Sequence, residues 1–238
     1  MIILGVETSC DETAAAVVRD GVHVLSSIVS SQHDIHTKFG GVVPELASRA
    51  HCENMLPVID SALRAASITP GQIDAIAVGH RPGLIGSLLV GVAAAKALAW
   101  SLGKPLIGVD HVHAHLYAGL LADSTAAPTT EPNLFPALGL VFSGGHTSIY
   151  QLSSWIELKR LGATIDDALG EAYDKVATIL GLPYPGGPNL DRLAQSIAAA
   201  SQTRLLRRRP RPGGGLFVAR RTDRARTCAR APSGDGAD

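Results

Sequence analysis

Apolar runs dominate the first half of the chain and predict a domain that mixes strands and helices. Three short apolar runs open the sequence, and Asp20-Gly21 between the second and third is a typical hairpin turn. A long amphipathic segment starts at Pro44 and contains Pro57, where we expect a kink or a break. The predicted strands are residues 2–7, 14–18, 22–30, 73–79 and 106–109, and the predicted helices are residues 44–66 and 87–102. The order βββαβαβ is typical of an α/β fold.

The same pattern begins again in the second half. A helix is predicted over residues 112–121 and a linker rich in Pro and Thr over 124–136. Strands at 137–142 and 147–152 then enclose the turn Ser143-Gly144-Gly145-His146, before a third strand at 158–163 and a helix at 166–180. The turn at 143–147 corresponds to the turn at 8–13, which predicts an internal duplication and a cleft between two facing lobes. We therefore expect a complete first lobe, residues 1–123, and a truncated second lobe, residues 124–201.

The hydrophobic periodicity ends near Ala200. Residues 202–238 carry ten Arg and three Asp, a composition that does not build a core. This basic tail fits either a disordered extension or aberrant, out-of-frame sequence in place of the true continuation. We favour the second interpretation, because a half-built lobe leaves a sheet edge uncovered.

Cysteine usage and hydropathy indicate a cytoplasmic protein. The three cysteines are widely spaced and form no CxxC pair, which fits a reducing compartment. The first apolar run is short and has no basic flank, so we expect no signal peptide. Residues 84–102 are long enough to span a membrane, but they include Lys96, which costs about 3 kcal/mol in lipid.

His111 and His115 are the candidate metal ligands. They stand four residues apart in the run HVHAH, after a predicted strand and at the start of a predicted helix. This spacing puts both imidazoles on one helix face, and open α/β sheets bind ligands at the carboxyl ends of strands. The alternative is two unrelated histidines, since His113 shows that histidine is frequent here. A zinc protease is disfavoured, because no Glu lies between the two ligands.

Glycine-rich turns and acids complete the candidate chemistry. Backbone N–H groups in tight turns at 83–87, 143–145 and 185–188 can bind phosphate, although each turn alone is also common without a ligand. Asp11 and Glu12, in the first hairpin, can serve as a base or position a metal-bound water. Asp174 can bond a ribose hydroxyl. Each of these acids is otherwise a solvated surface charge.

Six sequence blocks, in order, resemble a known family. They are LGVETSCDETAAAVV, FGGVVPELASRAH, GSLLVG, HVHAH, VFSGGHTS and IDDALGEAYDKVATILGLPYPGGP. From residue 2 to about residue 200, they resemble the tRNA threonylcarbamoyladenosine transferases (TsaD), once described as O-sialoglycoprotein endopeptidases. The resemblance implies a duplicated actin-like ATPase (ASKHA) fold. It also implies transfer of a threonylcarbamoyl group from its adenylate to N6 of adenosine 37 in tRNAs that read ANN codons.

The resemblance further implies roles for individual residues. Asp11 and Glu12 correspond to catalytic acids, and His111 and His115 to ligands of one divalent ion, Fe2+ or Zn2+. The residues implied in binding threonylcarbamoyl-AMP or ATP are Val141, Phe142, Ser143, Gly144, Gly145, Asp174, Gly187 and Asp191. The implied partners are tRNA and TsaB-like and TsaE-like proteins, without a membrane.

Two departures from the family pattern change the expectation for this chain. Arg81 stands where the family usually has glycine, in the loop before the helix at 87–102. The family also continues beyond the matching part, and that portion supplies an Asp metal ligand and an Asn that contacts nucleotide. We therefore expect weak or no activity from these 238 residues. The alternatives are a non-enzymatic fragment that docks a partner and, much less favoured, a metalloendopeptidase.

Overall fold

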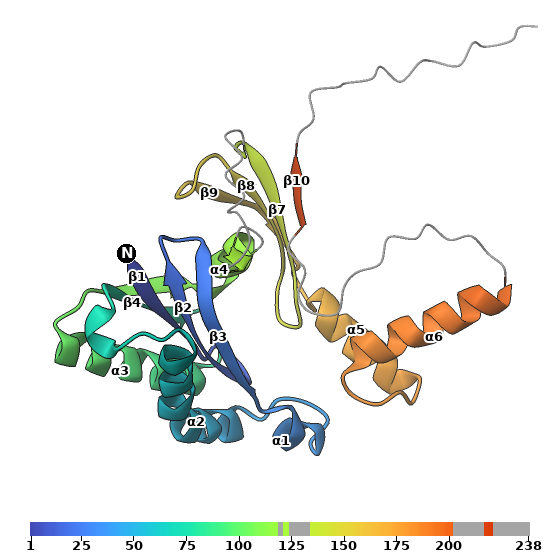
Figure 1. The fold of residues 1–238 in the computed structure, drawn as a ribbon. Helices are drawn as coiled ribbons and strands as arrows, with labels where there is room; N and C mark the ends of the chain where they lie inside the picture. The colour runs from blue at the N-terminus through green and yellow to red at the C-terminus, as the bar shows by residue number, and fades with distance from the viewer. Residues whose placement is uncertain (119–120, 124–133, 202–216, 221–238) are drawn as a thin grey trace, which may run out of the picture.

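A computed structural model describes residues 1–118, 121–123, 134–201 and 217–220 (Figure 1). The first half contains β1 (Ile2–Glu7), β2 (Glu12–Arg19), β3 (His23–Ser31), α1 (His33–Thr37), α2 (Pro44–Ala65), the 3-10 helix η1 (Pro70–Gln72), β4 (Ala75–Arg81), α3 (Ile85–Leu102), β5 (Leu106–Asp110), α4 (His111–Ala118) and β6 (Ala122–Asp123). The second half contains β7 (Ala137–Phe142), β8 (Thr147–Leu152), β9 (Leu158–Ala163), α5 (Leu169–Ile179), α6 (Gly186–Ser201) and β10 (Phe217–Arg220). The α/β class is confirmed.

The first sheet is mixed and brings three strand ends together. Its order is β5-β4-β1-β2-β3-β6, in which β1, β2 and β3 form an antiparallel meander, β4 runs parallel to β1, and β5 runs parallel to β4. Asp20 and Gly21 both have positive φ, as the predicted hairpin requires. Because β1, β4 and β5 end at the same edge, where β2 begins, Glu7, Asp11 and Asp110 share that edge.

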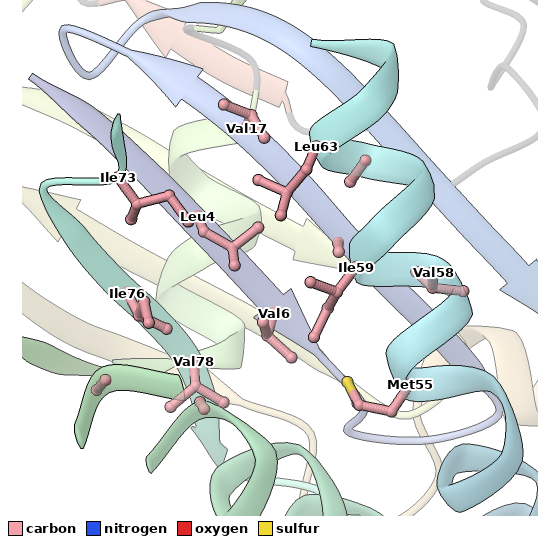
Figure 2. Packing of buried hydrophobic residues seen from close by; sticks show 14 residues of the cluster. Leu4, Val6, Val17, Met55, Val58, Ile59, Leu63, Ile73, Ile76 and Val78 are labelled. Carbon is pink, nitrogen blue, oxygen red and sulfur yellow. The ribbon is translucent and has the colours of Figure 1, made fainter. Parts of the chain in front are cut away.

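Helices α2 and α3 cover one face of this sheet and enclose the main core (Figures 1 and 2). Leu4 and Val6 are buried at alternate positions of β1, and Met55, Ile59 and Ala62 recur at helical spacing on α2. The full cluster is Leu4, Val6, Ala15, Val17, Met55, Val58, Ile59, Ala62, Leu63, Ile73, Ile76, Val78, Ala95 and Ala99. The edge that carries the candidate site therefore rests on a closed core.

Pro57 does not divide the long helix. α2 runs from Pro44 to Ala65 with Pro57 inside it, so the predicted break is wrong. Proline removes one backbone hydrogen bond, whereas Met55 and Val58 beside it are buried in the core, and this packing stabilises a continuous helix. Whether Pro57 kinks the helix stays a prediction.

Within the described residues, one helix, α3, is long and apolar enough to cross a membrane by length and composition. Its inner face is buried against β4 and α2 through Ser87, Leu88, Gly91, Ala95 and Ala99.

The sheet of the second half is smaller than that of the first, with four strands in place of six among the described residues. It has the antiparallel order β10-β7-β8-β9, and the predicted bounds of β7, β8 and β9 are confirmed. A smaller core joins α4 to this sheet through Val112, Leu116, Ala137, Val141, Tyr150 and Leu152. Helices α5 and α6 pack on each other (Figure 1). The β7-β8-β9 meander has the order of β1-β2-β3, while duplication of whole lobes stays a prediction.

Parts of the predicted division fall outside the described residues. These are most of the linker at 124–136 and, except for β10, the tail at 202–238. β10 pairs with β7 at the edge of the second sheet.

Candidate functional site

Helix α4 starts where β5 ends, and Asp110 caps its first turn. Asp110 Oδ1 accepts the backbone N–H groups of Val112 at 3.0 Å and His113 at 3.2 Å. On the helix fixed in this way, the Nε2 atoms of His111 and His115 are 3.1 Å apart. The two imidazoles therefore meet on one face, as their spacing predicts.

Glu7, at the end of β1, contacts His111 on its other nitrogen. Glu7 Oε2 lies 3.2 Å from His111 Nδ1, and the Ser9 hydroxyl lies 3.2 Å from the same atom. Gly79 on β4 leaves room for this carboxylate, because a Cβ there would overlap Glu7 Oε2. Burial by itself raises the pKa of Glu7, but hydrogen bonds and charge from His111, together with bonds from Ser9, bring that pKa below its usual value.

The pair has the geometry of two metal ligands. An imidazole that donates its Nδ1–H to a carboxylate presents its Nε2 lone pair, the usual arrangement in metal sites. Two nitrogens, each about 2.0–2.1 Å from a tetrahedral zinc ion, lie about 3.3 Å apart, close to the observed 3.1 Å. Within the described part of the chain, no group of three or more His, Cys, Asp or Glu could hold a metal. His111 and His115 therefore fit two positions of such a site.

His146 brings a third imidazole beside the pair. Its ring centroid lies 5.8 Å from that of His111. Burial, and next the neighbouring His111, lower the pKa of both His115 and His146. Both rings are therefore neutral at pH 7. Because His146 is the last residue of the turn Ser143-Gly144-Gly145-His146, this contact places the turn next to the histidine pair.

The turn Ser143-Gly144-Gly145-His146 presents open backbone. Ser143 N–H donates to the His146 carbonyl at 2.8 Å, and His146 N–H donates to Ser143 Oγ at 3.0 Å. Gly144 and Gly145 are exposed, with open space where side chains would stand. A turn of this kind leaves its glycine N–H groups accessible to a phosphate.

The first turn of α5 packs against this glycine turn. Gly170 N–H donates to the Ser143 carbonyl at 3.2 Å, and Leu169 N–H donates to Thr147 Oγ1 at 2.8 Å. A Cβ on Gly170 would lie 2.7 Å from Gly144 Cα, so the backbones approach as closely as glycine allows. A helix N-terminus here adds positive partial charge beside the turn.

Asp174, in the middle of α5, contacts the start of α6. Its Oδ1 accepts the backbone N–H of Gly186 at 2.6 Å. Burial first, and then the charges of Asp11 and Asp174, raise the pKa of Tyr184. Tyr184 therefore lies within electrostatic reach of both Asp11 and Asp174. Its ring stacks on that of His33, with the ring centroids 5.7 Å apart.

The remaining predicted residues lie around this cluster. Asp11 is half-buried and Glu12 is exposed at the start of β2. Asp191 is exposed on α6, where its Oδ2 accepts a hydrogen bond from Gln195 Nε2 at 2.7 Å. Val141 is buried in the second core, Phe142 is exposed, and Gly187 has open space beside it. None of these residues hydrogen-bonds to His111 or His115 within the described ranges.

Sequence reasoning missed Glu7, Ser9 and His146. Glu7 and His111 are 104 positions apart, so sequence spacing does not relate them. One available signal was that metal-binding histidines usually bond a carboxylate. Applied to the strands that end beside β5, that rule indicates the acid that closes β1.

Comparison with known proteins assigns the family. The model of the family described as "TsaD: tRNA N6-adenosine threonylcarbamoyltransferase" matches residues 23–222. A tRNA N6-adenosine threonylcarbamoyltransferase of Protochlamydia amoebophila is 53% identical over 195 residues, 82% of this chain and 55% of that protein. Its counterpart in Anaeromyxobacter dehalogenans is 56% identical over 193 residues, 81% of this chain and 56% of that protein.

Solved structures share less with the chain. YeaZ from Pseudomonas aeruginosa is 18% identical, with a TM-score of 0.44 over 68% of this chain and 66% of that one. A ROK hexokinase from Thermus thermophilus is 15% identical, with a TM-score of 0.45 over 85% of this chain and 71% of that one.

The chain spans about 55% of the length of the curated relatives that it matches. The family model covers most of its residues, and the relatives are more than half identical over the matched part. The chain therefore belongs to the tRNA N6-adenosine threonylcarbamoyltransferase (TsaD) family.

Proposed function

We propose that this chain carries the metal-binding and nucleotide-binding part of an enzyme that transfers the threonylcarbamoyl group of threonylcarbamoyl-AMP to N6 of adenosine 37 in tRNAs reading ANN codons. One observation carries the proposal. The histidine pair with its Glu7 contact lies beside the glycine turn, and His146 joins the two. The relatives named for this activity support it. The proposal includes a duplicated actin-like ATPase fold and a cytoplasmic location.

In this proposal, the residues of the second half bind the adenylate. The N–H groups of Gly144 and Gly145, which lie beside the N-terminus of α5, bind its phosphate, and Asp174 Oδ2 accepts a ribose hydroxyl. The other residues assigned to the nucleotide are Val141, Phe142, Gly187 and Asp191.

The acids of the first half move the proton. N6 of the adenosine attacks the carbamoyl carbon, the bond from that carbon to the phosphate oxygen breaks, and AMP leaves with the electron pair. Asp11 or Glu12 accepts the proton that N6 loses. N–H groups at the turn stabilise the charge on the departing phosphate.

His111 and His115 would hold the divalent ion, Fe2+ or Zn2+, and Glu7 would orient His111. When bound, such an ion supplies Lewis-acid polarisation of the group being transferred. The described residues provide two ligands, so we propose that the 238 residues alone turn over weakly or not at all. We also propose that the chain works with tRNA and with TsaB-like and TsaE-like proteins.

Direct titration with Zn2+ against a chromophoric chelator tests the metal site without requiring activity. Wild type and His113→Ala are expected to bind zinc equally, because His113 packs on Tyr150 instead of facing the pair. His111→Ala and His115→Ala are expected to lose binding. Glu7→Gln is expected to weaken binding about 10- to 100-fold, the usual effect of removing a carboxylate behind a histidine ligand. Equal affinity in all variants would refute the metal site.

AMP release with tRNA and the partner proteins tests the reaction itself. Release from threonylcarbamoyl-AMP that depends on tRNA supports the transferase. Weak tRNA-dependent release is the expected result for these 238 residues. Robust release would contradict the proposed impairment, and binding of zinc and partners with no release at all would identify the non-enzymatic docking fragment.

A further inference from the structure

The loop between β1 and β2 is held by three consecutive carbonyls. The Ser9 carbonyl accepts the N–H of Leu84 at 2.8 Å, and the Asp11 carbonyl accepts the N–H of Gln32 at 3.0 Å. Between them, the Cys10 carbonyl lies 3.0 Å from Nε2 of His51, a residue of α2. Two of these donors are backbone groups of neighbouring elements, and the middle one is a side chain. This loop carries Asp11 and leads into Glu12.

His51 belongs to a chain of hydrogen bonds with one direction. Val43 N–H donates to His36 Nδ1 at 3.3 Å, and His36 Nε2 lies 3.1 Å from Gln32 Oε1. Gln32 Nε2 lies 3.3 Å from His51 Nδ1, whose other neighbour is the Thr13 hydroxyl at 2.7 Å. The Val43 end is an N–H, which can only donate, and the Cys10 end is a carbonyl, which can only accept. These two ends assign every ring and amide between them: each histidine is neutral, with its proton on Nε2.

The side chains that form this series of hydrogen bonds lie in the protein interior. Thr13, His36 and His51 are fully buried, and Gln32 is 1% exposed. Buried polar side chains cost stability unless every group is paired, and here each has a partner. Apolar residues would fill the same space without placing polar groups in the interior that each need a hydrogen-bond partner. A complete polar network at this place therefore indicates a requirement for orientation.

We propose that His51 is a positioning residue that holds the Cys10–Glu12 loop, and with it Asp11 and Glu12, through its Nε2–H bond to the Cys10 carbonyl. The importance of that orientation for turnover rests on the proposed function of the two acids. The anchoring itself does not, and it is tested separately.

Two substitutions of similar size separate the two nitrogens of the ring. The amide nitrogen of His51→Gln can reach the Nε2 position and still donate to the Cys10 carbonyl. The shorter His51→Asn reaches the Nδ1 position, where it can accept from Thr13 but leaves that carbonyl without a donor. The readout is hydrogen exchange of the Gln32 and Leu84 amides in the 238-residue chain, because these two amides bond to the same loop.

In His51→Asn, both amides are expected to exchange about tenfold faster than in wild type, the effect of losing one buried hydrogen bond. In His51→Gln, they are expected to keep wild-type rates, while amides of β4 stay unchanged in both variants. Equal protection in all three proteins, or equal loss in both variants, would overturn the anchoring. The exchange measurement does not depend on turnover, so failure of the proposed role of Asp11 and Glu12 would leave the anchoring standing.

A measurement on the wild-type chain needs no variant to fold. Nitrogen NMR of labelled histidine reports which ring nitrogen of His51 carries the proton. Protonation at Nε2 is expected. A ring protonated at Nδ1 would leave Cys10 without its donor and overturn the inference.

Discussion

The two halves of the described chain differ in how completely they bury apolar surface. In the first half, fourteen hydrophobic residues form one core, all from strands and from α2 and α3 except Ile73, which follows η1 (Figure 2). In the second, six residues form the core, and none of the described side chains of α5 and of α6 up to residue 196 is among them. On α5, Ile179 is 83% exposed and Ala177 is the buried residue. Glu7 and the acidic loop therefore rest on a closed core, whereas the glycine turn rests on a smaller one.

Helix α4 belongs to both halves at once. It follows β5 of the first sheet, yet Val112 and Leu116 on its buried face pack in the core of the second. Its other face carries His111 and His115, and Glu7 of the first sheet reaches His111. The candidate metal site thus lies where the two packing units meet, and its geometry depends on both.

The largest expected difference between the halves is in stability. Ile76→Ala in the first core is expected to cost about 2–5 kcal/mol, because closely packed neighbours on strands and helices leave a cavity. Leu152→Ala in the second core is expected to fall at the low end of that range, because a small core can collapse around the loss. The change in unfolding free energy of each variant is measured by urea unfolding, with hydrogen exchange of amides in each half as the probe. Equal costs in one shared transition would show that the two cores are a single unit.

A smaller effect is expected where α5 meets the glycine turn. Gly170→Ala forces a Cβ against the backbone of Gly144 and is expected to cost about 1–3 kcal/mol. It should also weaken ATP binding, since the turn must move. Gly162→Ala, on β9 with open space beside it, is the matched control. If both variants bind ATP like wild type, the turn is not part of the nucleotide site.

The contrast between the halves also explains what the sequence could predict. The bounds of β7, β8 and β9 follow from their alternating apolar positions and flanking turns. Helix α1 has five residues, too few for a helical period to appear. The spacing of His111 and His115 is local and predicts their shared face. The contacts of Glu7 with His111, and of His51 with Cys10, join separate elements, and tertiary packing alone relates them.

The pH dependence of stability gives a further test of the first half, through His51. Burial lowers the pKa of His51 from the ordinary value of 6.5, against the Cys10 carbonyl, Asp11 and Glu7, which raise it, and with His36, which lowers it. The unfolded chain therefore binds more protons at this residue than the folded one. The stability that neutral His51 contributes to the folded state is present above pH 6.5 and is lost as the pH falls through the folded pKa.

The difference in unfolding free energy between wild type and His51→Gln isolates this residue from the other histidines. Below pH 6.5, wild type is expected to lose stability relative to the variant, by at most about 1.4 kcal/mol per pH unit for one proton. Urea titrations from pH 7.5 to about pH 5 cover this window. Parallel curves for the two proteins would show that His51 is not held neutral.

The smallest effect is expected at Arg81, which we predict to stand where the family usually has glycine. Arg81 Nε lies 3.5 Å from Asp110 Oδ2, and the arginine side chain is 70% exposed, so solvent screens the pair. Asp110 caps α4 with its other oxygen, Oδ1, and Gly83 beside Arg81 still packs closely on the Ser9 backbone. Arg81→Gly is therefore expected to change stability by less than about 1 kcal/mol and to leave zinc affinity unchanged.

Asp110→Ala, which removes the cap, is expected to cost about 0.5–2 kcal/mol and to weaken zinc binding, because the start of α4 positions His111. If Arg81→Gly has the larger effect on zinc affinity, the arginine itself positions α4 through its contact with Asp110.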